Sequence, residues 1–135
     1  MSAGAIVIST KRGLLKEFAN ELIKNNFNVE VSRSIVVSQI IDNEGIKLID
    51  RVFIDDGEEI FVDKNGFEEF EIQEYRRLLN EESCPLMQYY FKYRDRDFII
   101  DILLLVANRS DVVIDDDDSL IVRGDEFAQR VNEFK

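Results

Sequence analysis

The sequence predicts an α+β fold, a two-layer sandwich with a mostly antiparallel sheet and about four helices. One segment repeats its apolar residues every three or four positions, as an amphipathic helix does, and several short segments alternate apolar and polar residues, as half-buried strands do. These segments follow one another in a mixed order. Because the 135 residues include one proline and no Ser/Gly-rich linker, a single domain over residues 1–135 is expected.

The amino-terminal segment is expected to form a strand and then a helix. The apolar run Ala5 to Ile8 predicts the strand, and Ser9 or Thr10 is expected to accept the first amides of the helix. The helix is expected over residues 11–24, with one buried stripe made of Leu14, Leu15, Phe18, Ala19, Leu22 and Ile23. Asn25 and Asn26 tolerate left-handed backbone and are expected to end it.

A meander of strands is expected next, over residues 27–31, 35–41, 46–54 and 60–62. Turns are expected at Asp42 to Gly45 and at Asp55 to Gly57, so the second turn would be the tip of an acidic hairpin. A helix over residues 67–80 follows, with glutamates near its positive end, and then a strand over residues 86–93.

The last third of the chain mixes both kinds of element. Residues 98–107 are apolar on all sides and could form a buried strand or a buried helix; their leucine-rich second half favours a helix. Residues 112–114 and 120–122 are expected as strands on either side of four aspartates. Asp125 is expected to cap a short last helix that carries Phe127, Val131 and Phe134.

The composition narrows the classes of function. The chain lacks histidine, which most acid/base, Ser-His and His-metal chemistry requires at neutral pH, and its one cysteine excludes an internal disulfide. The longest apolar stretch is about half the length of a bilayer span. The first residues have no basic start and no long apolar run, so the chain is expected in a reducing cytoplasm. We expect a compact domain without cofactor or metal.

The net charge is −11, from 28 acidic and 17 basic residues, and it indicates the sign of the charge that a binding partner would carry. This charge repels phosphate backbones, so direct binding of nucleic acid is not expected. It favours a basic protein partner, because complementary fields speed association. Solubility alone is the alternative explanation of the acidity.

Two groups of carboxylates are the candidate partner-binding residues. The first is the predicted hairpin tip with Asp55, Asp56, Glu58 and Glu59, and the second is the run Asp115, Asp116, Asp117 and Asp118. Peripheral carboxylates steer a basic partner, while tyrosines anchor it. Strand alternation places Tyr89, Phe91 and Tyr93 on one face, so at least two of the four tyrosines are expected to be core residues instead. For the second group, a solvated acidic turn without a binding role is the alternative.

The aspartate run also resembles the DxDxT-type loop of haloacid dehalogenase-like phosphatases. That resemblance implies a magnesium-dependent phosphohydrolase in which Asp115 attacks phosphorus and Asp117 handles the proton of the leaving group. The family places this loop after its first strand, whereas only 15 residues follow Leu120 here. A calcium loop does not fit, because Leu120 occupies the position of the turn glycine.

The carboxyl-terminal segment FIIDILLLVANRSDVVIDDDDSLIVRGDEFAQRV is similar to the end of bacterial immunity proteins encoded beside polymorphic or contact-dependent growth-inhibition toxins. The residues that carry the likeness are Val112, Val113, Asp115 to Asp118, Asp125, Glu126 and Phe127. The resemblance implies a non-catalytic cytoplasmic protein that binds and blocks one cognate toxin domain, usually a nuclease. The alternatives are the phosphohydrolase and an acidic adaptor or regulatory domain.

Overall fold

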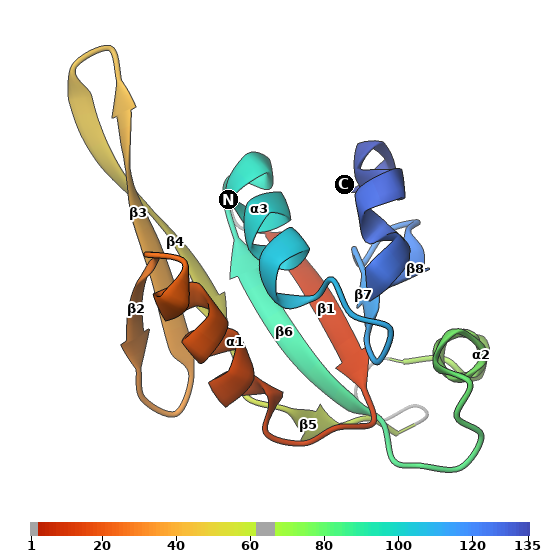
Figure 1. Ribbon diagram of the computed structural model, residues 1–135. Helices are drawn as coiled ribbons and strands as arrows, with labels where there is room; N and C mark the ends of the chain where they lie inside the picture. The colour runs from red at the N-terminus through yellow and green to blue at the C-terminus, as the bar shows by residue number, and fades with distance from the viewer. Residues whose placement is uncertain (1–2, 62–66) are drawn as a thin grey trace.

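The protein, described by a computed structural model over residues 3–61 and 67–135, is built on one twisted antiparallel sheet (Figure 1). The strand order is β2-β3-β4-β6-β1-β7-β8, and β5 also pairs with β6. The strands are β1 (Ala3–Ser9), β2 (Asn28–Val31), β3 (Ile35–Asn43), β4 (Ile46–Ile54), β5 (Glu58–Glu59), β6 (Met87–Tyr93), β7 (Val113–Asp115) and β8 (Ile121–Arg123). The helices are α1 (Leu14–Lys24), α2 (Glu69–Leu79), α3 (Arg96–Val106) and the 3₁₀ helix η1 (Gly124–Glu133). The α+β prediction is confirmed.

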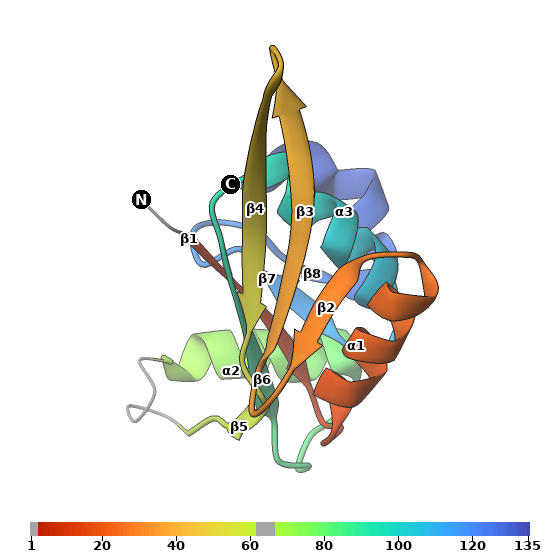
Figure 2. The same cartoon turned by 90° about the vertical axis from the view of Figure 1, so that its left-hand side faces the viewer.

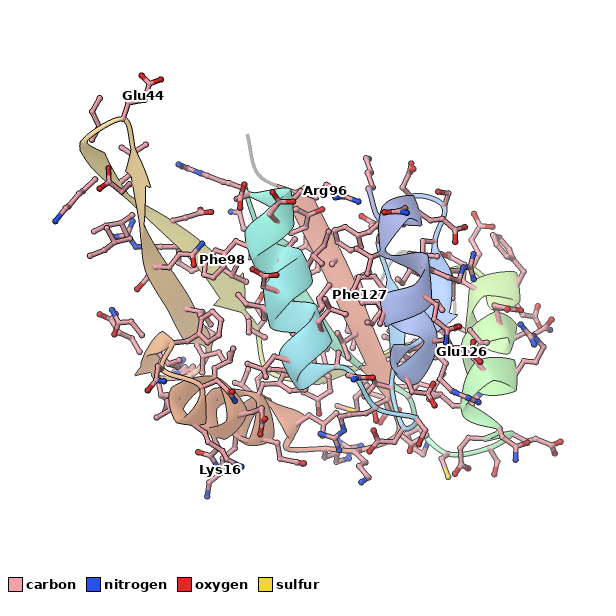
Figure 3. The ribbon with its side chains drawn as sticks, turned by 45° about the horizontal axis from the view of Figure 1, so that its top comes forward. Lys16, Glu44, Arg96, Phe98, Glu126 and Phe127 are labelled. Carbon is pink, nitrogen blue, oxygen red and sulfur yellow. The ribbon has the colours of Figure 1, made fainter. Side chains whose placement is uncertain are left out.

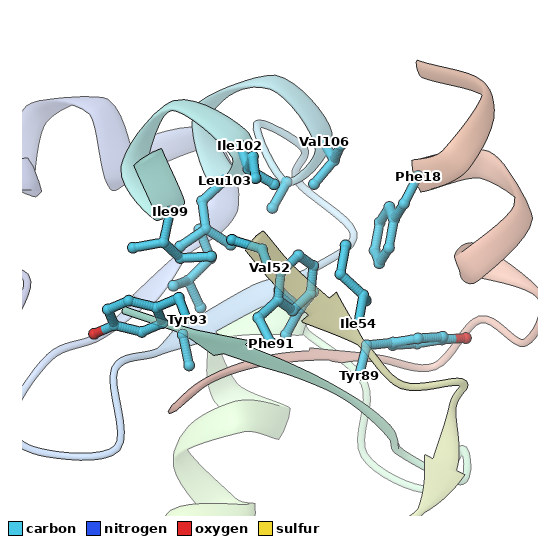
Figure 4. Packing of buried hydrophobic residues seen from close by; sticks show 14 of the residues in the cluster. Phe18, Val52, Ile54, Tyr89, Phe91, Tyr93, Ile99, Ile102, Leu103 and Val106 are labelled. Atoms are coloured by element: carbon cyan, nitrogen blue, oxygen red, sulfur yellow. The ribbon is translucent and has the colours of Figure 1, made fainter. Parts of the chain in front are cut away.

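The main core lies between the sheet and the helices α1, α3 and η1, which stand in front of the sheet in Figure 1. Alternation along β6 points Tyr89, Phe91 and Tyr93 into this core, as predicted. Figure 4 shows Phe91 and Tyr93 beneath α3, and Tyr89 below Phe18. Phe18 of α1 meets Tyr89 edge to face, with 5.6 Å between the ring centroids. The apolar stripe of α1 is therefore held against aromatic residues of the central strand.

A second, smaller core covers part of the opposite face of the sheet. Tyr75 and Ile72 of α2 pack there with Ile6 and Ile8 of β1 and with Val113. β1 is thus covered on both faces, which explains why its sequence is a continuous apolar run without alternation.

The hairpin of β3 and β4 extends beyond the rest of the sheet. β2 pairs only with residues 35–38 of β3, and β4 pairs with β6 only at Phe53 and Ile54. Residues 39–51, called the arm below, form a two-stranded ribbon that reaches past the helices in Figure 2. In the described part of the chain, no third strand lies beside it.

The helix starts differ from the predicted ones. α1 begins at Leu14 and not at Lys11, because Gly13 before it has left-handed backbone with φ of 76°. Ser9 is not its cap: the Ser9 hydroxyl donates to the Asp111 carbonyl at 2.8 Å and accepts from the Lys11 amide. The predicted cap Asp125 is likewise wrong, since its carboxylate accepts from the Arg123 side chain at 2.6 Å.

The ambiguous apolar segment is confirmed as a helix, α3, whose cap Asp95 accepts from the Phe98 amide at 2.9 Å. The predicted strand over residues 60–62 is not found where it can be checked: Ile60 and Phe61 lie outside any strand, and Val62 lies outside the described residues. The strand here is β5, which pairs with β6 and not with β4. The acidic residues around Asp55 therefore form a loop between two strands and not a hairpin tip.

Where the structure describes the chain, every helix is too short or too polar to cross a bilayer.

Candidate functional site

The segment Asp55 to Glu59, called the acidic loop below, follows the end of β4 and includes the short strand β5. The Asp55 amide donates to the Tyr90 carbonyl of β6 at 2.9 Å, and the Asp56 carboxylate accepts from the Gly57 amide at 2.7 Å. Backbone bonds to β6 at both ends hold the loop against the sheet. The carboxylates are therefore presented from a fixed backbone.

Gly57 allows this loop to lie directly on a buried tyrosine. A Cβ atom at position 57 would stand 2.8 Å from Cζ of Tyr89. The Tyr89 ring cannot withdraw, because its hydroxyl donates to the Lys11 carbonyl at 2.7 Å and accepts from the Leu14 amide at 3.3 Å. The same ring thus supports the acidic loop and the start of α1, and burial raises the pKa of its phenol.

Gly57→Ala is therefore expected to lower the free energy of unfolding by about 1–3 kcal/mol, because the added methyl group overpacks a rigid contact. Urea unfolding followed by circular dichroism measures this change. The exposed neighbour Asp56 provides the control, with a loss of less than about 0.5 kcal/mol expected for Asp56→Ala. Equal effects of the two substitutions would contradict the close-packing argument.

Three of the four predicted carboxylates of the acidic loop share one hollow. Asp55, Asp56 and Glu58 line a depression of about 210 Å³ together with Gln88 and Tyr90. Neither Asp55 nor Asp56 forms an ion pair with any other residue that the structure describes. The fourth carboxylate, Glu59, pairs with Arg12 at 3.1 Å. The loop thus presents unneutralised negative charge to solvent.

An apolar hollow of about 480 Å³ adjoins the acidic loop and has Asp56 in its lining. Leu15, Ala19 and Ile23 of α1 form one side, and Val31 with the start of β3 forms the other. The basic residues Lys16 and Arg33 also line the hollow. Ile23 is 52% exposed and Val31 63% exposed. The sequence placed Ile23 in the buried stripe of α1, and this is wrong because β2 is too short to cover the end of the helix. Helical spacing alone could not reveal this hollow.

The run Asp115 to Asp118, called the aspartate turn below, is not the exposed surface that the sequence predicted. Asp115 is 5% exposed and Asp116 is 2% exposed. Oδ1 of Asp116 accepts from the amides of Asp118, Ser119 and Leu120, at 2.9, 3.0 and 3.0 Å. Its Oδ2 accepts from the Lys135 amide at 3.0 Å. Asp116 is a structural residue that closes the turn and holds the end of the chain.

Asp115 lies beneath α2. Its carboxylate accepts a short hydrogen bond from the Tyr75 hydroxyl and a second one, at 2.8 Å, from the Asp117 amide. Burial raises the pKa of Asp115 and also that of Tyr75. A carboxylate that is buried and bonded at both oxygens does not offer the exposed nucleophile that the phosphohydrolase alternative requires.

The raised pKa of Asp115 predicts a pH effect on stability. The folded chain binds a proton at Asp115 more tightly than the unfolded chain does, so protonation of Asp115 stabilises the fold. This stabilisation is complete below the pKa that Asp115 has in the unfolded chain, and it is lost as pH rises through the pKa in the folded chain. Asp115→Asn cannot titrate. Its free energy of unfolding relative to the wild type is expected to increase from about pH 4 upward. Urea titrations of both proteins across this range measure the difference, and a decrease with pH would contradict the assignment.

The remaining aspartates, Asp117 and Asp118, are exposed at the tip of the aspartate turn. Asp117 has left-handed backbone with φ of 62°, and Asp118 lies 3.8 Å from the Lys135 ammonium group. Strands β6 and β1 separate this tip from the acidic loop, since Tyr90, Ile6 and Asp115 follow one another across the sheet. The two predicted groups therefore do not form one continuous patch.

Within residues 3–61 and 67–135, no three Asp, Glu or Cys side chains are grouped so that they could hold a metal ion. The site with the strongest features for binding is therefore the acidic loop with the apolar hollow beside it. No family model matches the chain, and neither a curated protein nor a solved structure matches it.

Proposed function

We propose that this chain is an immunity protein that binds and neutralises a cognate bacterial toxin, a basic nuclease domain, in the cytoplasm of the producing cell. The observation that carries the proposal is the acidic loop, whose Asp55, Asp56 and Glu58 surround one hollow without an ion pair to Asp55 or Asp56 from the described residues. A nuclease surface that binds phosphates is complementary to such a group.

The proposed mechanism is occlusion. Carboxylates of the acidic loop take the places of substrate phosphates on the toxin, while the apolar hollow between α1 and β2 receives an apolar or aromatic side chain. Binding energy concentrates in such desolvated pockets, and the charged rim sets the rate of encounter. The inhibitor then needs no catalytic group of its own.

The test is co-expression with the candidate toxin domain, the carboxyl-terminal domain encoded immediately upstream of this gene. Rescue of growth and a one-to-one complex in light scattering after gel filtration are the expected results. Absence of rescue at equal expression rejects the proposal in favour of an adaptor role. A complex that forms without loss of nuclease activity would reject occlusion.

A variant in the apolar hollow distinguishes the role of the hollow in holding the toxin from the role of the acidic loop in attracting it. Ile23→Arg places a charged side chain in the hollow from a half-exposed position of α1, so the fold is expected to remain intact. Dissociation of the toxin complex is expected to be at least about tenfold faster, with little change in the association rate. Gln73→Arg, an exposed position on α2 with the same change of net charge, is the matched control. Equal kinetics for the two variants would place the contact elsewhere.

A further inference from the structure

The arm has no core of its own. Ile40 and Ile49 point from one face of its ribbon, and Ile46 and Leu48 point from the other, as the register of β3 and β4 requires. All four are exposed, by 68%, 57%, 63% and 54% respectively. An isolated two-stranded ribbon is marginally stable in water. Open edges with exposed apolar residues are templates for pairing with another strand.

A fork opens where β4 departs from β6. Their ladder consists of two pairs, Phe53 with Lys92 and Ile54 with Phe91, and ends there. A cavity of about 350 Å³ lies beyond it, lined among others by Arg51, Lys92 and Arg94. Residues 46–52 of β4 have no strand beside them on this side among the described residues. The fork therefore has the open edge that an added strand requires.

The fork is positively charged although the protein is acidic. Arg51, Lys92 and Arg94 form no ion pair with a described residue, whereas six other arginines do: Arg12, Arg77, Arg96, Arg109, Arg123 and Arg130. One carboxylate, Asp50, also lines the fork, and its Oδ2 atom is buried without a hydrogen-bond partner in the described structure. The three cations outnumber this carboxylate, so the fork can receive an acidic group.

The tip of the same arm carries the opposite charge. Asp42 accepts from the Gly45 amide at 3.1 Å, and Glu44 has left-handed backbone with φ of 54°. Both residues are exposed, and Figure 3 shows Glu44 at the far end of the arm, away from the body of the protein. β4 thus runs from the acidic tip to the basic fork.

We propose that two copies of this chain associate by antiparallel pairing of the free edges of β4, so that the acidic tip of each arm enters the basic fork of the other. In a register centred on Leu48, Gly45 lies opposite Arg51 of the second copy, and Glu44 follows it into the fork. Lys47 lies opposite Ile49, so no like charges face each other there.

This arrangement obeys the symmetry of a closed dimer. A twofold axis through Leu48 makes both halves of the contact identical, tip to fork and fork to tip. It also joins the two sheets into one and covers exposed apolar residues of both arms. The proposal does not depend on the toxin-binding function, because it concerns the chain alone.

Charge reversal tests the pairing. Sedimentation velocity across a concentration series is expected to show a dimer for the wild type. Glu44→Lys and Arg51→Glu are each expected to raise the dimer dissociation constant at least about tenfold, and the double variant is expected to restore it. Glu82→Lys, far from the arm, is the control. Thermal unfolding of each variant verifies that these exposed substitutions leave the fold intact.

A wild type that is monomeric at every concentration overturns the proposal. So does a dimer whose dissociation constant none of the reversals changes, or one that the double variant fails to restore. Hydrogen exchange gives an independent measurement: the amides of residues 46–52 are expected to gain protection as the concentration rises. Protection confined to the β3 side of the arm would contradict pairing through β4.

Discussion

Asp116→Ala is expected to lower the free energy of unfolding by about 4 kcal/mol. The substitution removes a buried carboxylate that accepts from four backbone amides, those of residues 118–120 and that of Lys135. Hydrogen bonds to an ionised group contribute more than neutral ones, and donors left buried lose their hydration without replacement. Leu120 is 1% exposed, so water cannot easily replace the lost acceptor at its amide.

Two further substitutions separate this structural role from a general effect of charge. Asp118→Ala removes the same charge from an exposed position and is expected to cost less than about 0.5 kcal/mol. Asp116→Asn retains one carbonyl acceptor and is expected to fall between the two. Chemical unfolding of the three variants measures the series. A loss of under about 1 kcal/mol for Asp116→Ala would refute the role assigned to this residue.

Neutralising the acidic loop is expected to slow association with the toxin domain by about 10- to 100-fold at low ionic strength. The variant combines Asp55→Asn, Asp56→Asn, Glu58→Gln and Glu59→Gln, which changes the net charge from −11 to −7. Because Asn and Gln keep the shapes of Asp and Glu, the substitutions remove long-range electrostatic attraction and little else. The association rate is therefore also expected to depend less on salt concentration. Stopped-flow association rates in a salt series measure both effects.

A matched control carries the same net charge of −7, because it neutralises four exposed carboxylates outside the acidic loop: Glu69, Glu82, Asp97 and Asp101. At the physiological end of the salt series, where the Debye length is about 8 Å, its association rate is expected to change by less than about threefold, because charges far from the contact are screened. If both variants slow association equally, net charge and not the acidic loop attracts the toxin.

The sequence predicts correctly those helices and strands whose apolar residues recur at regular spacing on one buried face. α1 and β6 carry one apolar face each, and the alternation of Tyr89, Phe91 and Tyr93 places them correctly in the core. The sequence predicts less well where a residue that fits a local pattern bonds instead to a residue far away in the chain. Ser9 is an acceptable helix cap, but its hydroxyl bonds to Asp111, 102 residues away.

The candidate residues divide in the same way. Exposure of Asp55 and Asp56 follows from a polar loop between strands, and the structure agrees. Burial of Asp115 and Asp116 could not be predicted from an acidic run, because the donors that compensate it, Tyr75 and Lys135, are distant in sequence. The arm shows the reverse case: its alternating apolar residues predict strands but do not reveal that no further strand covers them.

The central position of β1 has a consequence for the order in which the chain folds. β1 is synthesised before the strands it pairs with: β6 lies on one side of it, and on the other lies β7, whose residues 113–115 are more than 100 positions later. Pairing at such separation is slow, because a long loop must close before the contact forms. During translation, Ala5 to Ile8 remain an open apolar edge until β7 has left the ribosome. A nascent chain that stops before β7 therefore exposes an aggregation-prone strand.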